Sequence, residues 1–260
     1  MRLEDISGRI ESISPLELQE SWDNSGFQVK LGNPEIHKVL VAMEVTGDVI
    51  GEAIEKEAQL IVCHHPMIFG SLKKIDLDEV VGNYISLLMQ NGISVYATHT
   101  PFDKCKGGNN DYLARLLGLI NIGMMPGDSS EICRIGELRE PERLVDFAEK
   151  IKAIAGLEEE GLRFTGYADS MIQKVGICTG SGAEFLEAAF YNGCDLFITG
   201  DVKYHAAQLA KELGMNLLDM GHFGTEQFFT ENMAALLIEK CGNECEIFES
   251  SVDLNPFEML

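Results

Sequence analysis

The amino-acid sequence predicts an α/β protein built from two similar βα-rich halves with mostly parallel strands. Short apolar runs alternate along the chain with segments of helical period, which is the pattern of βαβ units. A strand, turn, helix and strand that begin at Lys38 recur at nearly the same spacing from Lys174. Polar residues follow the strands in both halves, and open parallel sheets bind ligands beyond the carboxyl ends of their strands. We therefore expect the halves to face each other across one cleft.

Each element is assigned from its periodicity and its end residues. Short apolar runs predict strands at Val39–Val45, Leu60–Cys63, Ile93–Ala97, Lys174–Cys178, Asp195–Thr199 and Asn216–Met220. Segments of helical period, several of them capped or ended by Gly or Asn, predict helices at Gly47–Glu57, Glu79–Gln90, Asn109–Leu117, Pro141–Ala155, Ala183–Asn192, Val202–Leu213 and Thr225–Lys240. The alternative to a duplicated half is a pair of ordinary βα runs that happen to align.

The segment Pro126–Gly136 carries Gly, Ser and Pro and is the expected linker, followed by a strand-like stretch at Ile132–Leu138. We therefore assign residues 1–128 to an N-terminal α/β half and residues 129–260 to a C-terminal one. A solvated acidic turn is expected at Gly156–Gly161, and disorder is expected only in the tail Asp253–Leu260.

The composition disfavours several classes of function. The chain has 260 residues, of which 45% are hydrophobic and 24% charged, enough to bury a sizeable core. Its formal net charge of −22 disfavours binding to nucleic acid or to anionic membranes. No apolar run approaches the roughly 20 residues of a membrane span, and the start MRLEDISGRIESI lacks the features of a signal peptide. We expect a cytoplasmic protein.

The seven cysteines are odd in number and include no C-x-x-C pair, so we expect reduced thiols. Cys63, Cys178 and Cys194 lie within or beside apolar stretches and are expected to pack as small hydrophobes. Cys241 and Cys245 could bind a metal or form a redox pair, but no second cluster lies nearby in sequence to complete four ligands. The role of this pair stays open.

Two histidines end the expected strand Leu60–Cys63. His64 and His65 are followed by Pro66, which favours an extended conformation at His65. Adjacent strand residues point to opposite faces, so both imidazoles can reach one site only where the strand breaks up. Pro66 supplies that break, and each of two metal ions could take one imidazole.

The next expected strand ends in a similar way. His99 follows Ile93–Ala97, and Asp103 is expected in the loop beyond it. Asp103 can bind a hard or borderline cation, whereas His99 could be a ligand, an orienting residue or a proton shuttle. An Asp in a Gly-rich loop is also a common turn former. This motif therefore indicates a metal site only together with the other His and carboxylate motifs.

A third polar motif follows the strand Asn216–Met220. His222 and Glu226 are spaced so that they share one face if the following helix has already begun. Gly221 and Gly224 allow a close approach of the backbone. The helix dipole would favour a glutamate in the first turn without any ligand, but this accounts only for Glu226.

Three imidazoles and two carboxylates thus form the candidate ligand set, which is His64, His65, Asp103, His222 and Glu226. Such a set suffices for two divalent ions if one carboxylate bridges them. Nitrogen and oxygen ligands without thiolate suit Zn, Fe, Mn, Co or Ni. Paired ions of this kind activate water and polarise a substrate oxygen, which is hydrolase chemistry. His37, which precedes a strand, is interpreted as a surface residue.

The chain resembles the YbgI-like, Nif-three-like dinuclear metal-centre family, whose members are described as GTP cyclohydrolase I type 2 homologues. The motifs that carry the resemblance span nearly the whole chain: WDNSGFQV (22–29), CHHP (63–66), THTPFD (98–103), GGNND (107–111), the Gly-Ser-Gly turn (180–182), TGDVKYH (199–205) and GHFGTE (221–226). The length matches the short form of the family, without the domain that longer members insert between their halves.

The resemblance implies the same five metal ligands, with Glu226 as the bridge between the ions. It also implies that His99 and His205 line the same cavity, where they would orient other groups or transfer protons. Toroidal homohexamers are expected, with the metal sites facing an internal cavity. The implied activity is opening of the guanine imidazole ring of GTP with release of formate.

The preferred function is therefore a dinuclear metal-dependent hydrolase that opens a nucleotide heterocycle. The alternatives are a dinuclear metal phosphoesterase and a non-enzymatic metal-binding or regulatory protein. A Walker-type phosphate loop is absent from the sequence. Lysines that flank the motifs could instead contact phosphates, namely Lys73, Lys74, Lys104, Lys106 and Lys203.

Overall fold

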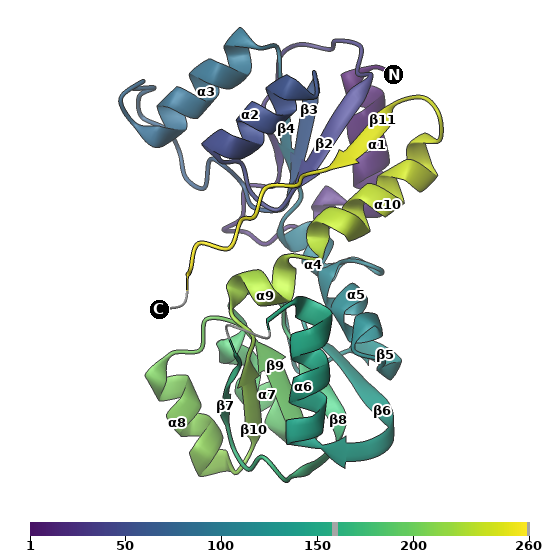
Figure 1. Ribbon diagram of the computed structural model, residues 1–260, viewed down its shortest axis with the longest axis vertical. Coiled ribbons are helices and arrows are strands. Elements are labelled where there is room, and N and C mark those ends of the chain that lie inside the picture. Colours follow the sequence, from purple (N-terminus) through teal and green to yellow (C-terminus); the bar gives the residue numbers. More distant parts are fainter. Residues whose placement is uncertain (158–160, 259–260) are drawn as a thin grey trace. The chain divides into compact units, whose positions relative to one another are not determined.

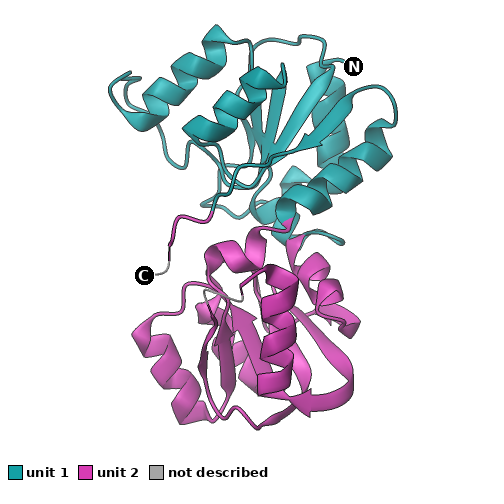
Figure 2. Ribbon diagram, in the orientation of Figure 1, with its two compact units in different colours: residues 1–108, 229–254 teal, residues 109–228, 255–260 magenta. Residues whose placement is uncertain are grey.

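The computed structural model describes residues 1–157 and 161–258, and the chain divides into two compact units (Figure 1, Figure 2). Unit 1 comprises Met1–Gly108 and Phe229–Leu254, and unit 2 comprises Asn109–Phe228 and Asn255–Leu260. The expected acidic turn at 156–161 and the end of the expected tail at 253–260 lie partly outside the described residues.

Unit 1 contains a five-stranded sheet in the order β1-β4-β3-β2-β11. Its strands are β1 (Gly26–Val29), β2 (Lys38–Ala42), β3 (Leu60–Cys63), β4 (Ser94–Ala97) and β11 (Glu246–Glu249). Strand β1 is antiparallel to β4, and the other neighbours are parallel. The carboxyl ends of β2, β3 and β4 therefore lie at one edge of the sheet.

Helices cover both faces of this sheet, as Figure 1 shows. They are α1 (Leu3–Ile13), the 3-10 turn η1 (Leu16–Leu18), α2 (Gly47–Glu55), α3 (Val80–Gln90), α4 (Thr100–Lys104) and α10 (Phe229–Cys241). Because strand side chains alternate between faces, Val39 and Val41 pack with α1 and α10, whereas Leu40 and Ala42 pack with α2 and α3.

Unit 2 contains a six-stranded sheet in the order β5-β6-β8-β9-β10-β7. Its strands are β5 (Ile120–Met124), β6 (Arg134–Arg143), β7 (Arg163–Thr165), β8 (Met171–Ile177), β9 (Leu196–Thr199) and β10 (Asn216–Asp219). Strands β8, β9 and β10 are parallel, and β5, β6 and β7 pair antiparallel. Over the two sheets, five of the nine strand pairs of the described residues are parallel, which agrees with the mostly parallel α/β fold that the sequence predicts.

The helices of unit 2 also pack on both faces of their sheet. They are α5 (Asn109–Leu116), α6 (Leu144–Ala155), the 3-10 turn η2 (Ala183–Phe185), α7 (Leu186–Tyr191), α8 (Tyr204–Leu213) and the short α9 (His222–Glu226). Leu113 of α5 and Phe147 of α6 share one core with Val175, whereas Leu186 of α7 and Ala210 of α8 pack around Phe197.

Both units repeat one order of elements, as the sequence predicts. In unit 1, β2, α2, β3, α3 and β4 form two consecutive parallel βαβ units, and in unit 2 the same order runs from β8 through α7, β9 and α8 to β10. In both sheets these three strands are neighbours in chain order.

The structure corrects two expected helices. The segment Pro141–Arg143 belongs to β6 rather than to the expected helix 141–155, because these residues pair with β8 and the helix begins only at Leu144. The expected helix 225–240 is two helices, α9 and α10, since Phe229 packs in the core of unit 1 whereas Glu226 belongs to unit 2.

The units are not contiguous in sequence. Met233 and Leu237 of α10 pack with α1 and β2, so the C-terminal segment returns to unit 1. The expected division at residue 128 falls inside unit 2, because Leu113 and Ala114 of α5 pack with the core of that unit. Among the helices of the described residues, none combines the length and the apolar character needed to cross a membrane.

Candidate metal centre

Three imidazoles of unit 1 gather at the carboxyl ends of the neighbouring strands β3 and β4. His64 and His65 follow β3, and His99 follows β4. One ring nitrogen from each of the three lies within 4.8 Å of the others. The backbone amides of His64 and His65 both donate to the carbonyl oxygen of Met43, 3.1 Å away, so the regular strand has ended where both rings emerge.

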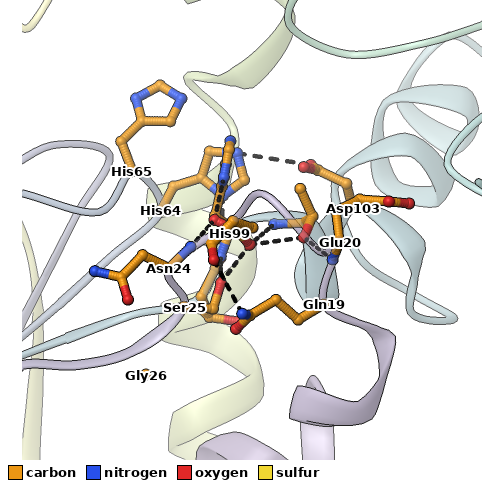
Figure 3. Close-up of polar contacts among 12 residues, drawn as sticks. Gln19, Glu20, Asn24, Ser25, Gly26, His64, His65, His99 and Asp103 are labelled. Carbon is orange, nitrogen blue, oxygen red and sulfur yellow. Dashed lines mark hydrogen bonds and ion pairs between the residues drawn. The ribbon is translucent and has the colours of Figure 1, made fainter. Parts of the chain in front are cut away.

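His64 is fully buried, and each of its ring nitrogens faces an oxygen atom of the protein. Figure 3 shows its contact with Asp103. Its Nδ1 lies 3.1 Å from the carbonyl oxygen of Thr98, which can only accept, so Nδ1 carries the proton. In the neutral ring Nε2 is then the lone-pair nitrogen, and it lies 3.6 Å from Oδ1 of Asp103. Asp103 stands in the helix α4, whereas the sequence predicted a loop at this position.

Asp23 fixes the orientation of His99. Its carboxylate accepts from Nδ1 of His99 at 2.9 Å, from Oγ1 of Thr100 at 2.6 Å and from Oγ of Ser25 at 2.8 Å. Burial alone would raise the pKa of Asp23, but the hydrogen bonds from His99 and Thr100 outweigh it and hold that pKa well below its ordinary value. An ionised Asp23 leaves Nε2 of His99 unprotonated in the neutral ring.

His65 follows the same pattern, because its Nδ1 lies 3.4 Å from Oε1 of Glu44. The imidazole is mostly buried, and its ring centroid is 4.8 Å from that of His64 and 5.4 Å from that of His99. Glu44 is the residue after Met43, whose carbonyl oxygen accepts from the amides of both histidines. One turn after β2 therefore orients both members of the histidine pair.

Unit 2 carries a second cluster on α9 and the turn after β9. Nδ1 of His222 lies 2.8 Å from Oδ2 of Asp201, and its Nε2 lies 3.0 Å from Oε2 of Glu226. Helix α9 begins at His222, so His222 and Glu226 share one face, as their spacing predicts. Asp201 has a φ of 53°, a left-handed conformation that Asp adopts more readily than most residues.

Gly180 makes room for the carboxylate of this second cluster. A Cβ at Gly180 would lie 2.3 Å from Oε1 of Glu226, and the residue has a φ of +65°. Its amide donates to Oγ1 of Thr225 at 2.8 Å, so the turn after β8 is tied to α9. A side chain at position 180 would displace Glu226, and this explains a glycine in the predicted Gly-Ser-Gly turn.

The donor chemistry of the clusters fits a transition-metal ion. Nδ1 of each imidazole faces a protein oxygen, on Thr98, Glu44, Asp23 and Asp201. Histidines that bind metal through Nε2 characteristically donate their other N–H to a carbonyl or carboxylate in this way. Two donors that bind one tetrahedral ion at about 2.0–2.2 Å lie about 3.3–3.6 Å apart, which matches the separation of His64 Nε2 and Asp103 Oδ1.

The remaining histidines lie apart from these contacts. His205 is exposed in the first turn of α8, where its ring packs edge-on against Tyr204 with centroids 5.4 Å apart. His37 is exposed near Glu35, with 3.8 Å between Nε2 and Oε2, in keeping with a surface residue. Two of the flanking lysines are engaged in ion pairs, Lys74 with Asp76 and Glu79, and Lys104 with Glu20.

Sequence reasoning missed the residues that orient the imidazoles. Asp23, Glu44 and Asp201 were not among the candidates, although Asp23 and Asp201 stand in the quoted motifs WDNSGFQV and TGDVKYH. Asp201 follows β9 at the same sheet edge as the other polar groups, and this position could have indicated it. No local pattern points to Asp23 or Glu44.

The family is identified by comparison with known proteins. A model of the Duf34/NIF3 (NGG1p interacting factor 3) family matches residues 1–256, and the chain belongs to this family. It is 37% identical over 264 residues, all of both chains, to a Clostridium perfringens protein named GTP cyclohydrolase 1 type 2 homolog. It is 36% identical over 232 residues, 88% of each chain, to a Helicobacter pylori protein named GTP cyclohydrolase 1 type 2.

The fold agrees with that family. The crystal structure of a Bacillus cereus protein related to NIF3 superimposes with a TM-score of 0.92 and 25% identity, over 100% of this chain and 99% of that chain. The resemblance and the fold class that the sequence predicts are therefore confirmed.

Proposed function

We propose that the protein is a dinuclear metal-dependent hydrolase that opens the imidazole ring of a guanine nucleotide. The observation that carries the proposal is the shared orientation of the imidazoles. In both units each imidazole of a cluster presents Nδ1 to a protein oxygen, which leaves Nε2 as the donor for a metal. The names of the Clostridium perfringens and Helicobacter pylori relatives support the nucleotide as substrate.

The proposed ligands are those predicted from the sequence, His64, His65, Asp103, His222 and Glu226, with Glu226 as the bridge. They would hold two divalent ions from the set Zn, Fe, Mn, Co and Ni. When bound, such ions lower the pKa of water and polarise the bond under attack. Burial of His64, Asp103 and Glu226 supports this assignment, because buried carboxylates and imidazoles are retained mainly where a charge partner offsets their desolvation.

His99 is the proposed proton carrier. Because Asp23 accepts from Nδ1, the neutral ring can take a proton only at Nε2, and the resulting imidazolium would be stabilised by the ionised Asp23. From the family resemblance we also propose that His205, in the first turn of α8, orients other groups or transfers protons.

The reaction consumes two waters. The first attacks the carbon between the two imidazole nitrogens and breaks one carbon–nitrogen bond, which yields a formamide. The second hydrolyses the formamide to formate and an amine. The protons released by the waters pass to the ring nitrogens, so no oxidant or reductant is required.

Formate release tests the proposal directly. Metal-loaded protein incubated with GTP should release formate, and the variants His65→Ala and Glu226→Gln should lower the rate at least about 100-fold. His37→Ala is the matched control, because His37 is an exposed histidine outside the clusters. Phosphate release from phosphoesters without formate would support a phosphoesterase instead. Metal binding with neither product would support a metal-binding or regulatory protein.

We also propose, from the family resemblance, that the protein is a cytoplasmic homohexamer. Its mass in solution, measured by light scattering, should equal that of six chains. A mass of one or two chains would contradict the hexamer and leave the metal chemistry to be tested separately.

A further inference from the structure

Two exposed aromatic rings stack on each other in unit 1. Trp22 is 56% exposed and Phe69 is 55% exposed, although both carry large apolar surfaces. Their ring centroids are 6.3 Å apart, and their planes differ by 16°. Trp22 follows η1 and Phe69 lies beyond β3, so two loops that are distant in sequence present two nearly parallel, exposed rings.

This aromatic pair adjoins the histidine cluster. His99 meets Trp22 edge-on, with centroids 5.8 Å apart and planes at 74°, and it meets Phe69 in the same manner at 5.8 Å and 71°. A ring nitrogen of His99 lies within 4.8 Å of those of His64 and His65. A group held against Trp22 or Phe69 would therefore be next to the proposed proton carrier.

The two loops are fixed to each other by hydrogen bonds. Nδ2 of Asn24 donates to the carbonyl oxygen of Ile68 at 2.5 Å, and the amide of Ile68 donates to Oε1 of Gln28 at 3.0 Å. Nε2 of Gln28 donates to the carbonyl oxygen of Asn24 at 2.6 Å. Asp23, beside Trp22, is held by His99, Thr100 and Ser25. The aromatic pair is thus set in place before any ligand arrives.

An exposed aromatic surface that is held rigidly suits one class of ligand. Flat heteroaromatic rings stack on Trp and Phe irrespective of their hydrogen-bonding edges, and a rigid surface loses little entropy when they bind. The chain's net charge of −22 opposes a polymer with many phosphates more strongly than it opposes one mononucleotide. The surface therefore favours a single small ring over a nucleic-acid strand.

We propose that Trp22 and Phe69 form the stacking site for the heterocycle of the substrate and hold that ring beside His99. This proposal rests on the proposed function for the class of substrate, and it adds the place where the ring of that substrate binds. Trp22 and Phe69 are positioning residues here, because they would contact the ring while the histidine clusters carry the chemistry.

Trp22 is the only tryptophan of the chain, so its fluorescence reports on this site alone. Protein as purified is titrated with guanosine, GTP and inorganic tripolyphosphate, with excitation at the red edge of the tryptophan band. Guanosine and GTP should quench the fluorescence saturably, whereas tripolyphosphate, which lacks a ring, should not. Phe69→Leu should weaken guanosine binding about 5- to 100-fold, and Phe69→Tyr should restore it to within about 3-fold.

The matched control is Tyr167→Leu, which replaces an exposed aromatic side chain in unit 2 and should leave the titration unchanged. The stacking site would be overturned if Phe69→Leu bound guanosine as tightly as the wild type does. It would also be overturned if neither guanosine nor GTP quenched the fluorescence saturably. Tighter binding of single-stranded RNA than of GTP would overturn the assignment to a mononucleotide.

Formate release separates this inference from the proposed function. Quenching that depends on Phe69, without formate release from GTP, would retain the stacking site and reject the reaction. Formate release with an unchanged KM in Phe69→Leu and Trp22→Ala would retain the reaction and reject the stacking site. If both hold, Phe69→Leu should raise KM by the same factor by which it weakens guanosine binding.

Discussion

Nδ1 of His222 lies 2.8 Å from a carboxylate oxygen of Asp201, and this contact directs Nε2 of the same ring toward Glu226, 3.0 Å away. An equivalent relationship joins Asp23 to His99 in unit 1. In both units a carboxylate outside the proposed ligand set determines which ring nitrogen is available. These two acids therefore offer tests that leave the proposed ligands in place.

Asp201→Asn should weaken metal binding about 10- to 100-fold, because an amide no longer stabilises the orientation and charge of the His222 ring. Asn also tolerates the left-handed backbone at position 201, so the variant keeps the conformation that its φ of 53° requires. Competition with a chromophoric chelator measures the affinity. An affinity equal to that of the wild type would show that Asp201 does not support a metal-binding histidine.

Asp23→Asn should lower the rate of formate release about 10- to 100-fold. In this variant Nδ1 of His99 loses its charged acceptor, and the imidazole ring loses its fixed orientation. The buried Asp23 accepts several hydrogen bonds, so its replacement by Ala should cost about 1–3 kcal/mol in the free energy of unfolding. Denaturant unfolding measures that cost. Asp78→Asn, an exposed control, should change neither property.

Gly180→Ala should reduce bound metal because its Cβ would displace Oε1 of Glu226. Gly193→Ala is the matched control. Gly193 has a nearly equal φ of +69°, but within the described part of the chain a Cβ there would have no atom within 4 Å apart from its chain neighbours. Both variants should lose about 1–2 kcal/mol from the left-handed backbone, and only Gly180→Ala should lose metal as well. Equal metal content in the two variants would show that the space at Gly180 does not serve Glu226.

Glu52 makes the stability of unit 1 depend on pH. Its carboxylate accepts from Oγ of Ser250 at 2.6 Å and from the amide and hydroxyl of Ser251 at 3.0 and 2.8 Å. Burial would raise the pKa of Glu52, but these hydrogen bonds outweigh it, so its pKa lies below the ordinary value of 4.5.

Because the pKa of Glu52 is lower in the folded state than in the unfolded state, its contribution to stability is present above pH 4.5 and is lost as the pH falls through the folded pKa. The free energy of unfolding of Glu52→Gln should therefore decline less steeply below about pH 5 than that of the wild type. Urea unfolding at a series of pH values measures both slopes. Parallel curves would contradict this assignment.

The sequence predicted the parts of the site that follow from local patterns. Strand β3 ends at Cys63, as expected from its apolar run, and the His64–His65 pair emerges where Pro66 breaks the strand. The spacing of His222 and Glu226 likewise predicted one helical face. These features depend on a few consecutive residues, so their periodicity and their proline or glycine neighbours are sufficient to indicate them.

Long-range pairing decides the features that the sequence did not reveal. Asp23 reaches His99 because β1 pairs with β4 and aligns Gly26 with Ala97, and β1 is too short to stand out in the sequence. The break between α9 and α10 likewise depends on where Phe229 packs. Neither the strand pairing nor the packing of Phe229 leaves a periodic pattern in the residues themselves.

Metal stoichiometry tests the central claim most directly. Elemental mass spectrometry is applied to protein purified without chelators or a metal-binding tag, alongside His65→Ala, Glu226→Gln and the exposed control His37→Ala. We predict about two transition-metal ions per chain in the wild type and in His37→Ala, and a clear loss in the other two variants at unchanged helical content. Wild-type protein that holds no metal, and takes up none when Zn, Mn or Fe is added, would contradict the dinuclear centre.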